Sequence, residues 1–353
     1  MSQSVTHDAV LLLGFGGPEG PDDVMPFLEN VTRGRGVPRD RLEEVAEQYL
    51  LFGGRSPIND QHRALLAAVG AELERRGRAL PLYWGNRNWE PYVEDVLREI
   101  AGAGHRRVVA FTGSAYSSYS ACRQYWEDID RAQASVRESG DEPPAVDKVR
   151  PYFNHPGFVL AMVERVHSAL EELSPADRNQ ARLVFTAHSI PQSMASTSDY
   201  EVQLRDVAAM VSERVALARS AEWELVFQSR SGPPQVPWLE PDVVDHLGAV
   251  HERDDRVVVL VPIGFTSDHM EVAYDLDTQA AAAADELGLT LVRARTVGTH
   301  PLFVRGLVDV IDELLVGAPA AALGSFGARV TPCAAGCCPA PARPGGRPAT
   351  ARP

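Results

Sequence analysis

The feature that most limits the fold of this chain is a repeated alternation of short, nearly continuous apolar runs with longer amphipathic stretches. Apolar runs of this length are typical of strands buried on both faces of a parallel sheet. They occupy 9–15, 80–85 and 107–112 in the first half, and 182–187, 224–228, 256–263 and 289–293 in the second. Helical periodicity covers 38–52, 57–76, 90–103, 118–136, 156–173, 200–219, 241–253, 269–287 and 301–316. The pattern predicts an α/β protein in which helices connect parallel strands.

The length of 353 residues predicts more than one domain. A polar stretch at 138–147, ESGDEPPAVD, separates two halves of similar rhythm. We expect two Rossmann-like, doubly wound domains, 1–145 and 146–318, each with a parallel sheet flanked by helices and with the active site in the cleft between them. Residues 319–353 form an Ala/Pro/Gly-rich tail with three cysteines, which is too poor in large apolar residues for a core. We expect this tail to be ordered only where something fastens it.

Charge and hydropathy exclude several classes of protein. Lys plus Arg number 34 against 48 for Asp plus Glu, a net charge of −14, so nucleic acid is not an expected partner. The longest apolar run, 257–265, is less than half of the roughly 20 residues that a membrane helix needs. The first nine residues lack the features of a secretory signal. We therefore expect a soluble, cytoplasmic protein without a transmembrane segment; its oligomeric state stays open, a monomer included.

Polar and glycine-rich residues follow most of the predicted strands. They lie at 14–18, 113–116, 188–191, 229–232 and 264–269. Ligands of open α/β sheets bind outside the carboxyl ends of the strands. The loop at 14–18 has neither G-x-G-x-x-G nor a following Gly-Lys-Ser/Thr, so a tight turn that lets a flat ligand approach is favoured over a dinucleotide site.

His188 and the acidic residues after the run 256–263 are the candidates for chemistry. Considered alone, His188 could be a structural histidine held by hydrogen bonds instead of a catalytic base or a metal ligand. Acidic residues in the first turn of a helix are often present because they complement the helix dipole, and this ordinary reason explains Asp268 well. It explains Glu271 and Asp275 less well, because these two residues lie four positions apart, on one face of an otherwise apolar helix. We expect an imidazole and a carboxylate from opposite lobes to converge across the cleft, an arrangement that suits ferrous iron and proton removal. The sequence has no H-E-x-x-H motif, so a metal in transit is favoured over a permanently held one.

Arginines and cysteines form two further sets. Arg33, Arg35 and Arg55, with Ser56, occupy loops of the first half; singly each arginine is a solvated charge, and as a group they suit carboxylate recognition.

Cys333, Cys337 and Cys338 lie within six residues of the tail, whereas Cys122 lies far away. Three reduced cysteines in the tail and one in the first half could fasten the tail to the fold by binding an iron-sulfur cluster or a zinc ion. Composition alone does not distinguish the cluster from zinc.

Taken together, the segments at 13–18, 52–58, 185–191, 228–233, 238–241 and 264–271 resemble the ferrochelatases, in order along 9–316. The resemblance implies that the enzyme takes a porphyrin and ferrous iron as substrates and inserts the metal. It implies catalytic roles for His188 and Glu271, contact of both and of Asp275 with the incoming iron, and supporting roles for Asp268 and His269. The porphyrin contacts that it implies are Phe15, Arg33, Arg35, Tyr49, Arg55, Ser56 and Tyr119.

The resemblance also suggests the porphyrin and a cofactor. Coproporphyrin III, with four propionates, is favoured over protoporphyrin IX, with two, because of the Arg33 and Arg35 pair and the lack of a membrane-binding extension. Some relatives hold a 2Fe-2S cluster with one central and three C-terminal cysteines, which implies Cys122, Cys333, Cys337 and Cys338 as its ligands here. Two alternatives stay open: a chelatase for cobalt or another tetrapyrrole, and a tetrapyrrole carrier without activity, which would not need Glu271 as a proton acceptor.

Overall fold

The computed structural model describes residues 6–34, 36–215, 222–232, 235–334 and 336–341. It contains two four-stranded parallel sheets in the orders β2-β1-β3-β4 and β6-β5-β7-β8. The strands of the first sheet are β1 (Ala9–Gly14), β2 (Leu82–Asn86), β3 (Arg107–Thr112) and β4 (Ala145–Lys148). Those of the second are β5 (Arg182–His188), β6 (Glu224–Gln228), β7 (Val257–Val261) and β8 (Thr290–Arg293). The predicted α/β architecture of two doubly wound lobes is therefore confirmed.

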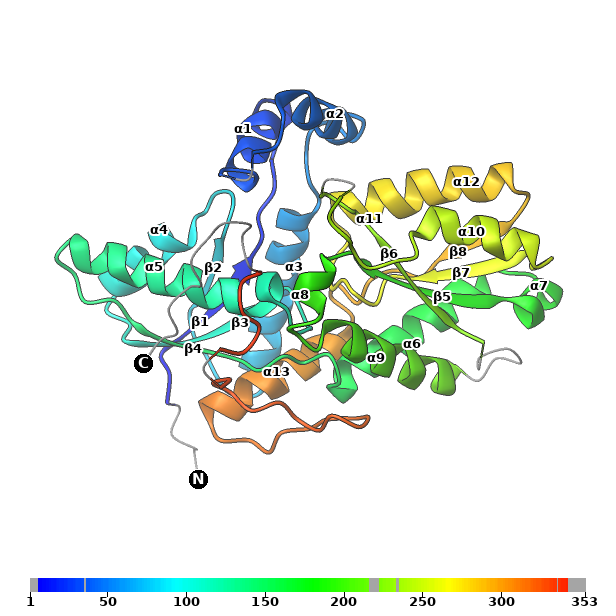
Figure 1. The fold of residues 1–353 in the computed structure, drawn as a ribbon. Helices are drawn as coiled ribbons and strands as arrows, with labels where there is room; N and C mark the ends of the chain where they lie inside the picture. Colours follow the sequence, from blue (N-terminus) through cyan, green and yellow to red (C-terminus); the bar gives the residue numbers. More distant parts are fainter. Residues whose placement is uncertain (1–5, 35, 216–221, 233–234, 335, 342–353) are drawn as a thin grey trace.

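Helices cover both faces of each sheet (Figure 1). In the first lobe they are α1 (Pro21–Val31), α2 (Arg39–Leu50), α3 (Ile58–Arg75), α4 (Val93–Gly102), the π-helical segment η1 (Tyr119–Arg123) and α5 (Gln124–Glu138). The second lobe has α6 (Pro156–Glu171), α7 (Pro175–Gln180), α8 (Gln192–Ala195), α9 (Tyr200–Val215), α10 (Val243–Glu252), α11 (Met270–Tyr274), the π-helical segment η2 (Asp275–Ala280) and α12 (Ala281–Glu286). The last helix, α13 (Pro301–Leu315), packs against α3 and α6 and so joins the two lobes.

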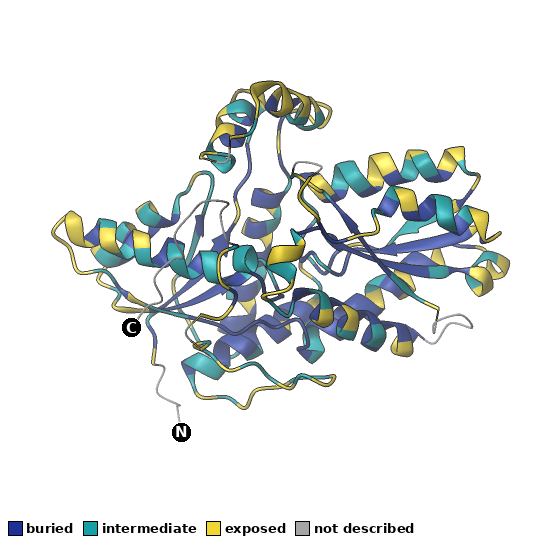
Figure 2. Cartoon of the chain, in the orientation of Figure 1, coloured by how far each residue is buried: buried dark blue, intermediate teal, exposed yellow. Residues whose placement is uncertain are grey.

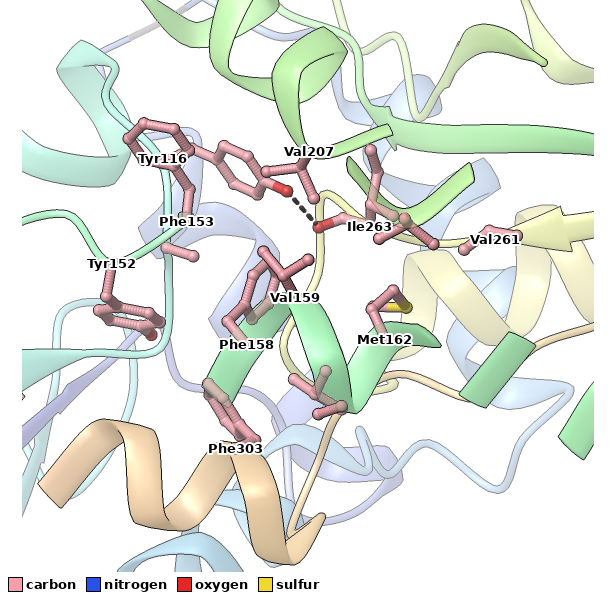
Figure 3. Close-up of a cluster of buried hydrophobic side chains, with 14 of the residues drawn as sticks. Tyr116, Tyr152, Phe153, Phe158, Val159, Met162, Val207, Val261, Ile263 and Phe303 are labelled. Carbon is pink, nitrogen blue, oxygen red and sulfur yellow. Dashed lines mark hydrogen bonds between the residues drawn. The ribbon is translucent and has the colours of Figure 1, made fainter. Parts of the chain in front are cut away.

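The core follows the two-residue period of the strands. In β1, Val10 and Leu12 face a cluster that also includes residues of α3, α6, α9, α13 and the second sheet, whereas Ala9, Leu11 and Leu13 face α4 and α5. Strands buried on both faces explain why their sequences are continuous apolar runs instead of alternating ones (Figure 2). In the cluster shared by the lobes, Phe158 packs against Tyr116, Tyr152 and Phe303 (Figure 3).

Several predicted elements need correction. The stretch 138–147 is not free of strands, because β4 begins at Ala145 and pairs with β3, so the first sheet extends to Lys148, three residues past the predicted boundary. Helix α1, which begins at Pro21, was not predicted. The stretches 118–136 and 269–287 are not continuous α-helices, since each contains a π-helical segment. Residues 216–219 of the predicted helix 200–219 lie outside the described residues.

The tail crosses from α13 to the first lobe without a helix or strand among its described residues (Figure 1). Leu323 N–H donates to the Asn154 carbonyl over 2.8 Å, and the ring of Phe326 meets that of Phe153 edge-on at 5.7 Å. Further along, Thr331 donates to the carbonyl of Lys148 over 3.0 Å. These contacts fasten a segment that has no core of its own.

Candidate active site

His188 is the last residue of β5, at the carboxyl edge of the second sheet. Its Nδ1 is hydrogen-bonded to the carbonyl of Ser189. Because a carbonyl only accepts, Nδ1 carries the hydrogen and Nε2 keeps its lone pair in the neutral ring. Nε2 lies 3.6 Å from Oε1 of Glu271. The two predicted groups therefore do face each other.

They do not come from opposite lobes, which corrects that part of the prediction. His188 ends β5 and Glu271 lies in the first turn of α11, which follows β7; both elements belong to the second lobe. Strands β5 and β7 are neighbours in the sheet, so their carboxyl ends meet at one edge and bring the two side chains together.

The turn before α11 is held by Asp268 and His269. Nδ1 of His269 accepts a hydrogen bond from the backbone N–H of Glu271 over 3.2 Å and so caps the helix. The ring of His269 also packs edge-on against Phe265 at 4.9 Å. Oδ1 of Asp268 pairs with Nη1 of Arg293 at 3.0 Å. Both residues thus have local partners that fix the start of the helix.

The helix changes to π-helical geometry at Asp275, directly after α11. The carboxylate of Asp275 accepts a hydrogen bond from the hydroxyl of Ser229. Gln228 donates to the Glu271 carbonyl over 3.1 Å and lies 3.5 Å from Oδ2 of Asp275. Ser229 has a φ of 63°, a left-handed conformation that is uncommon for residues other than glycine, asparagine and aspartate. The ends of β5, β6 and β7 therefore each contribute to one cluster of polar groups.

The two facing groups shift each other's pKa in opposite directions. Desolvation in the cleft raises the pKa of Glu271, but the charges of His188 and His269 and the contact with His188 outweigh it and lower this pKa to about 2. Desolvation lowers the pKa of His188, and the charge of Glu271 more than compensates, so the pKa of His188 lies above its ordinary value. Both side chains remain partly exposed, with 31% and 47% of their surface accessible to solvent. Glu271 is therefore ionised at neutral pH, with a basic imidazole beside it.

Asp275 behaves differently. Burial and the nearby charge of Glu271 raise the pKa of Asp275 to about 6, although the hydrogen bond from Ser229 opposes the shift. A carboxyl group with this pKa exchanges protons close to neutral pH. In the described part of the chain, no three His, Cys, Asp or Glu side chains are arranged to hold a metal ion. The cluster can accept protons and offer nitrogen and oxygen donors to a divalent cation that passes through.

The first lobe supplies an aromatic and apolar wall. Phe15, directly after β1, is 40% exposed, and its ring meets that of Phe27 at 6.3 Å. Tyr49 of α2 also packs against Phe27. Burial, with a smaller part from the charge of Glu271, raises the pKa of Tyr49. Beside this wall, between α2 and Tyr274, lies a cavity of about 660 Å³. It is lined by Arg41, Glu44, Glu47, Gln48, Leu50, Leu51 and Tyr274.

None of the predicted porphyrin contacts that the structure describes, Phe15 and Tyr49 included, lines this cavity. Arg33 is exposed and Arg35 lies outside the described residues. Arg55 pairs with Asp60 at 2.7 Å and lies 3.4 Å from Glu19. Ser56 is buried, and Tyr119 donates to Glu127 over 2.9 Å. Their part in binding a porphyrin stays a prediction.

The three tail cysteines lie near Cys122 of the first lobe, from which they are distant in sequence. Cys122, in η1, is buried, and a hydrogen bond with Cys333 lowers the pKa of the Cys122 thiol to about 5, with help from the charge of Lys148. Nζ of Lys148, the single lysine of the chain, lies 3.4 Å from Sγ of Cys122. Cys337 and Cys338 have their Sγ atoms 3.7 Å apart. The thiols thus form two pairs with a cation beside them.

Sequence reasoning missed several residues around these groups. Ser229 and Gln228 support Asp275 and Glu271, Arg293 pairs with Asp268, and Arg41 lines the cavity. The polar residues after β6 were recognised as part of the loop edge, which is the one sequence signal that pointed to Ser229. Arg293 and Arg41 lie on a strand and a helix and carry no local signal.

Comparisons with known proteins point to one family. The ferrochelatase family model matches residues 7–315. Coproporphyrin III ferrochelatase of Streptomyces coelicolor is 51% identical over 351 residues, covering 95% of this chain and 94% of the relative. The protein of the same name from Mycolicibacterium smegmatis is 52% identical over 315 residues, 89% of this chain and 92% of that protein. A ferrochelatase of Rhodopirellula baltica is 48% identical over 362 residues, 99% of this chain and 100% of the relative.

Among solved structures, SirB from Bacillus subtilis with Fe³⁺ has the same two-lobed fold. It superimposes with a TM-score of 0.53 at 13% identity, covering 88% of this chain and 96% of that structure. At this level of identity the likeness concerns the fold alone.

Proposed function

This chain belongs to the ferrochelatase family, and we propose that it inserts ferrous iron into coproporphyrin III, with His188 and Glu271 as the groups that receive the protons of the porphyrin. The observation that carries this proposal is the 3.6 Å approach of His188 Nε2 and Glu271 Oε1 at the carboxyl edge of the second sheet. Relatives named for coproporphyrin III, such as that of Streptomyces coelicolor, support the choice of porphyrin.

The proposed chemistry follows from what a free-base porphyrin must lose. Its ring is planar and carries two inner N–H protons, so the metal enters only when the ring bends and two acceptors are nearby. Nε2 of His188 takes one proton and the carboxylate of Glu271 the other. Asp275, with a pKa of about 6, accepts protons from this pair and releases them towards solvent, while Ser229 holds its carboxylate. Bending the ring costs about 1 to 5 kcal/mol, which contacts remote from the metal supply.

Those remote contacts are assigned to the first lobe. The exposed ring of Phe15 and the side chain of Tyr49 form an apolar wall for the macrocycle. Arg41, on the cavity lining, is assigned to a propionate; it pairs with Glu44 at 2.6 Å and, like Arg55, would have to leave this partner. Arg55 is already paired with acidic residues, so it would have to leave them to bind a substrate carboxylate.

One experiment tests both the activity and the substrate. The protein is incubated anaerobically with ferrous iron and either coproporphyrin III or protoporphyrin IX, and the loss of free-base absorbance is followed. We expect a higher kcat/KM for coproporphyrin III. An equal or higher value for protoporphyrin IX overturns the substrate assignment, and absence of insertion into either porphyrin overturns the activity.

We further propose that Cys122, Cys333, Cys337 and Cys338 hold a 2Fe-2S cluster. Four thiols are the number of ligands that such a cluster needs, and they lie as two pairs, although among the described residues the two pairs do not converge on one metal position. The cation of Lys148 offsets thiolate charge. When bound, the cluster would supply a one-electron redox centre. Cysteines that serve as cluster ligands must stay reduced, which favours the cytoplasm.

The cluster proposal has its own test. Anaerobically purified protein is expected to be coloured and to contain two iron and two sulfide per chain, by the definition of the cluster, and Cys122→Ser is expected to lose both. Colourless protein with bound zinc overturns the cluster, and protein without metal or sulfide overturns the site. Ser139→Ala, on an exposed residue just after α5, is the control.

A further inference from the structure

The segment between β7 and α11, residues 262–269, belongs to the second lobe but is hydrogen-bonded to the first lobe at three points. Tyr116 donates to the carbonyl of Ile263 over 2.9 Å (Figure 3). The hydroxyl of Thr266 donates to the carbonyl of Gly113 over 2.5 Å. The third contact is made by Gln61, in the first turns of α3, with the backbone of Asp268. The segment that leads into Glu271 is therefore held from the opposite lobe.

The Gln61 contact uses both polar atoms of the amide. Nε2 donates to the carbonyl of Asp268 over 2.6 Å, and Oε1 accepts from the N–H of the same residue over 2.8 Å. Two parallel hydrogen bonds to one residue fix its orientation as well as its distance. The contact engages only the backbone of Asp268, so its carboxylate stays paired with Arg293.

The residues after Asp268 connect this contact to the proposed chemistry. His269 follows at once and caps α11 through the N–H of Glu271. Glu271 then faces His188. A shift of the Asp268 backbone would therefore move the helix start and change the separation of Glu271 and His188. Displacements of about 1 Å at a reacting group can reduce the rate by about a hundredfold.

We propose that Gln61 is a positioning residue for iron insertion: from the first lobe, its side-chain amide fixes the Asp268 backbone so that Glu271 faces His188. Gln61 is argued to act through Asp268 and not by contact with the reacting atoms. The proposal rests on the roles of His188 and Glu271 proposed above. It predicts that loss of the amide lowers kcat and leaves porphyrin binding nearly unchanged.

The chain offers a matched control in Gln203 of α9. Oε1 of Gln203 accepts from the N–H of Ser117 over 2.9 Å, and its Nε2 donates to the Ser117 hydroxyl over 3.0 Å. This is also a two-bond contact between the lobes, made in the reverse direction and fully buried, but one of its bonds goes to a side-chain hydroxyl instead of a backbone carbonyl. Its two bonds end on Ser117, the residue after Tyr116, and not on a residue of 262–269. A role limited to holding the lobes together should therefore appear at Gln203 as strongly as at Gln61.

The test compares Gln61→Met and Gln203→Met, in which a side chain of similar size loses its hydrogen bonds. Insertion is measured anaerobically with ferrous iron and coproporphyrin III, porphyrin affinity by quenching of protein fluorescence, and folding by thermal unfolding. We expect Gln61→Met to lower kcat about tenfold with porphyrin affinity within twofold of the wild type. Gln203→Met is expected to lower the melting temperature by at least as much and to keep kcat within twofold.

The result that overturns the proposal is an equal loss of kcat in the two variants, or a Gln61→Met variant with unchanged kcat. Glu271→Gln is measured alongside to separate this failure from failure of the proposed function. If Glu271→Gln keeps wild-type insertion, the assigned chemistry fails. If Glu271→Gln is inactive and Gln61→Met resembles the wild type, only the positioning role fails.

Discussion

The two sheets have the same strand order, yet the loops that follow their strands carry different groups. In the second lobe, the ends of β5, β6 and β7 bring His188, Ser229 and Glu271 into one cluster. In the first lobe, the end of β1 presents the exposed ring of Phe15, and the hairpin of α1 and α2 adds an apolar wall. The same sheet architecture thus carries an acid–base cluster in the second lobe and an apolar binding wall in the first, because the functional groups lie on the loops and not on the sheet.

The largest expected effect is on the acid–base cluster of the second lobe. Glu271→Gln keeps the size of the side chain and removes the proton acceptor, so we expect kcat to fall by about 10² to 10⁴. Porphyrin affinity should stay within twofold, because binding is assigned to the first lobe. Insertion rates and fluorescence quenching measure the two quantities. Wild-type insertion by this variant would remove the proposed division between the lobes.

The next effect tests whether the two lobes are separate folding units. Phe158→Ala opens the cluster shared by both lobes and is expected to lower the free energy of unfolding by about 3 to 5 kcal/mol, in a single transition. Ile129→Ala, in the cluster confined to the first lobe, is the comparison. Denaturant unfolding followed by circular dichroism measures both. Two separate transitions for Phe158→Ala would show that the lobes unfold independently.

A smaller effect concerns the ion pairs of α3, the helix that joins the first lobe to α13. Hydrogen bonds from Arg75 and Arg76, together with the charges of the two arginines, stabilise the ionised carboxylate of Glu72. They outweigh desolvation and lower the pKa of Glu72 to about 2, below its ordinary value of 4.5. This contribution to stability is present above pH 4.5 and is lost as the pH falls towards 2. Glu72→Gln should therefore cost about 1 to 2 kcal/mol at pH 7, allowing for the exposure of Arg75, and almost nothing near pH 2.

Urea unfolding at several pH values measures this dependence. Glu74→Gln, on an exposed residue of the same helix, is the control and should change stability by less than about 0.5 kcal/mol. A cost for Glu72→Gln that does not change with pH would contradict an ionic origin.

The smallest expected effect is on the binding wall. Arg41→Ala removes a cation from the cavity lining and should raise KM for coproporphyrin III about two- to fivefold, with kcat unchanged. Arg39→Ala removes an exposed arginine of the same helix that does not line the cavity, and should leave KM unchanged. Equal effects of the two variants would indicate a general change of charge near the cleft.

The sequence predicted those parts of the molecule whose structure is determined by the pattern of neighbouring residues. Apolar runs such as that of β7 can only be buried on both faces, and the rule for strand ends placed His188 and Glu271 near one another. The expectation that the two groups come from opposite lobes was wrong, and the predicted second domain, 146–318, already contains both; what the local pattern does not contain is the strand order that makes β5 and β7 neighbours.

Other parts depend on contacts between distant residues. The π-helical segment at Asp275 covers only six residues, too few to show a period of its own, so the sequence does not distinguish it from the flanking α-helices. Strand β4 is short and half polar, and its pairing with β3 decides its structure. Gln61 acts through the backbone of a residue in the other lobe, which leaves no pattern around position 61.

The position of α13 has a consequence for how the chain is made. This helix is close to the C-terminal end of the fold, yet it packs on α3, and Thr6 next to β1 donates to the carbonyl of Leu314 over 2.9 Å. During synthesis from the N-terminus, the first sheet leaves the ribosome long before the helix that covers α3 exists. The nascent first lobe therefore exposes an apolar surface until translation is nearly complete, and the chain buries it only when its last helix arrives.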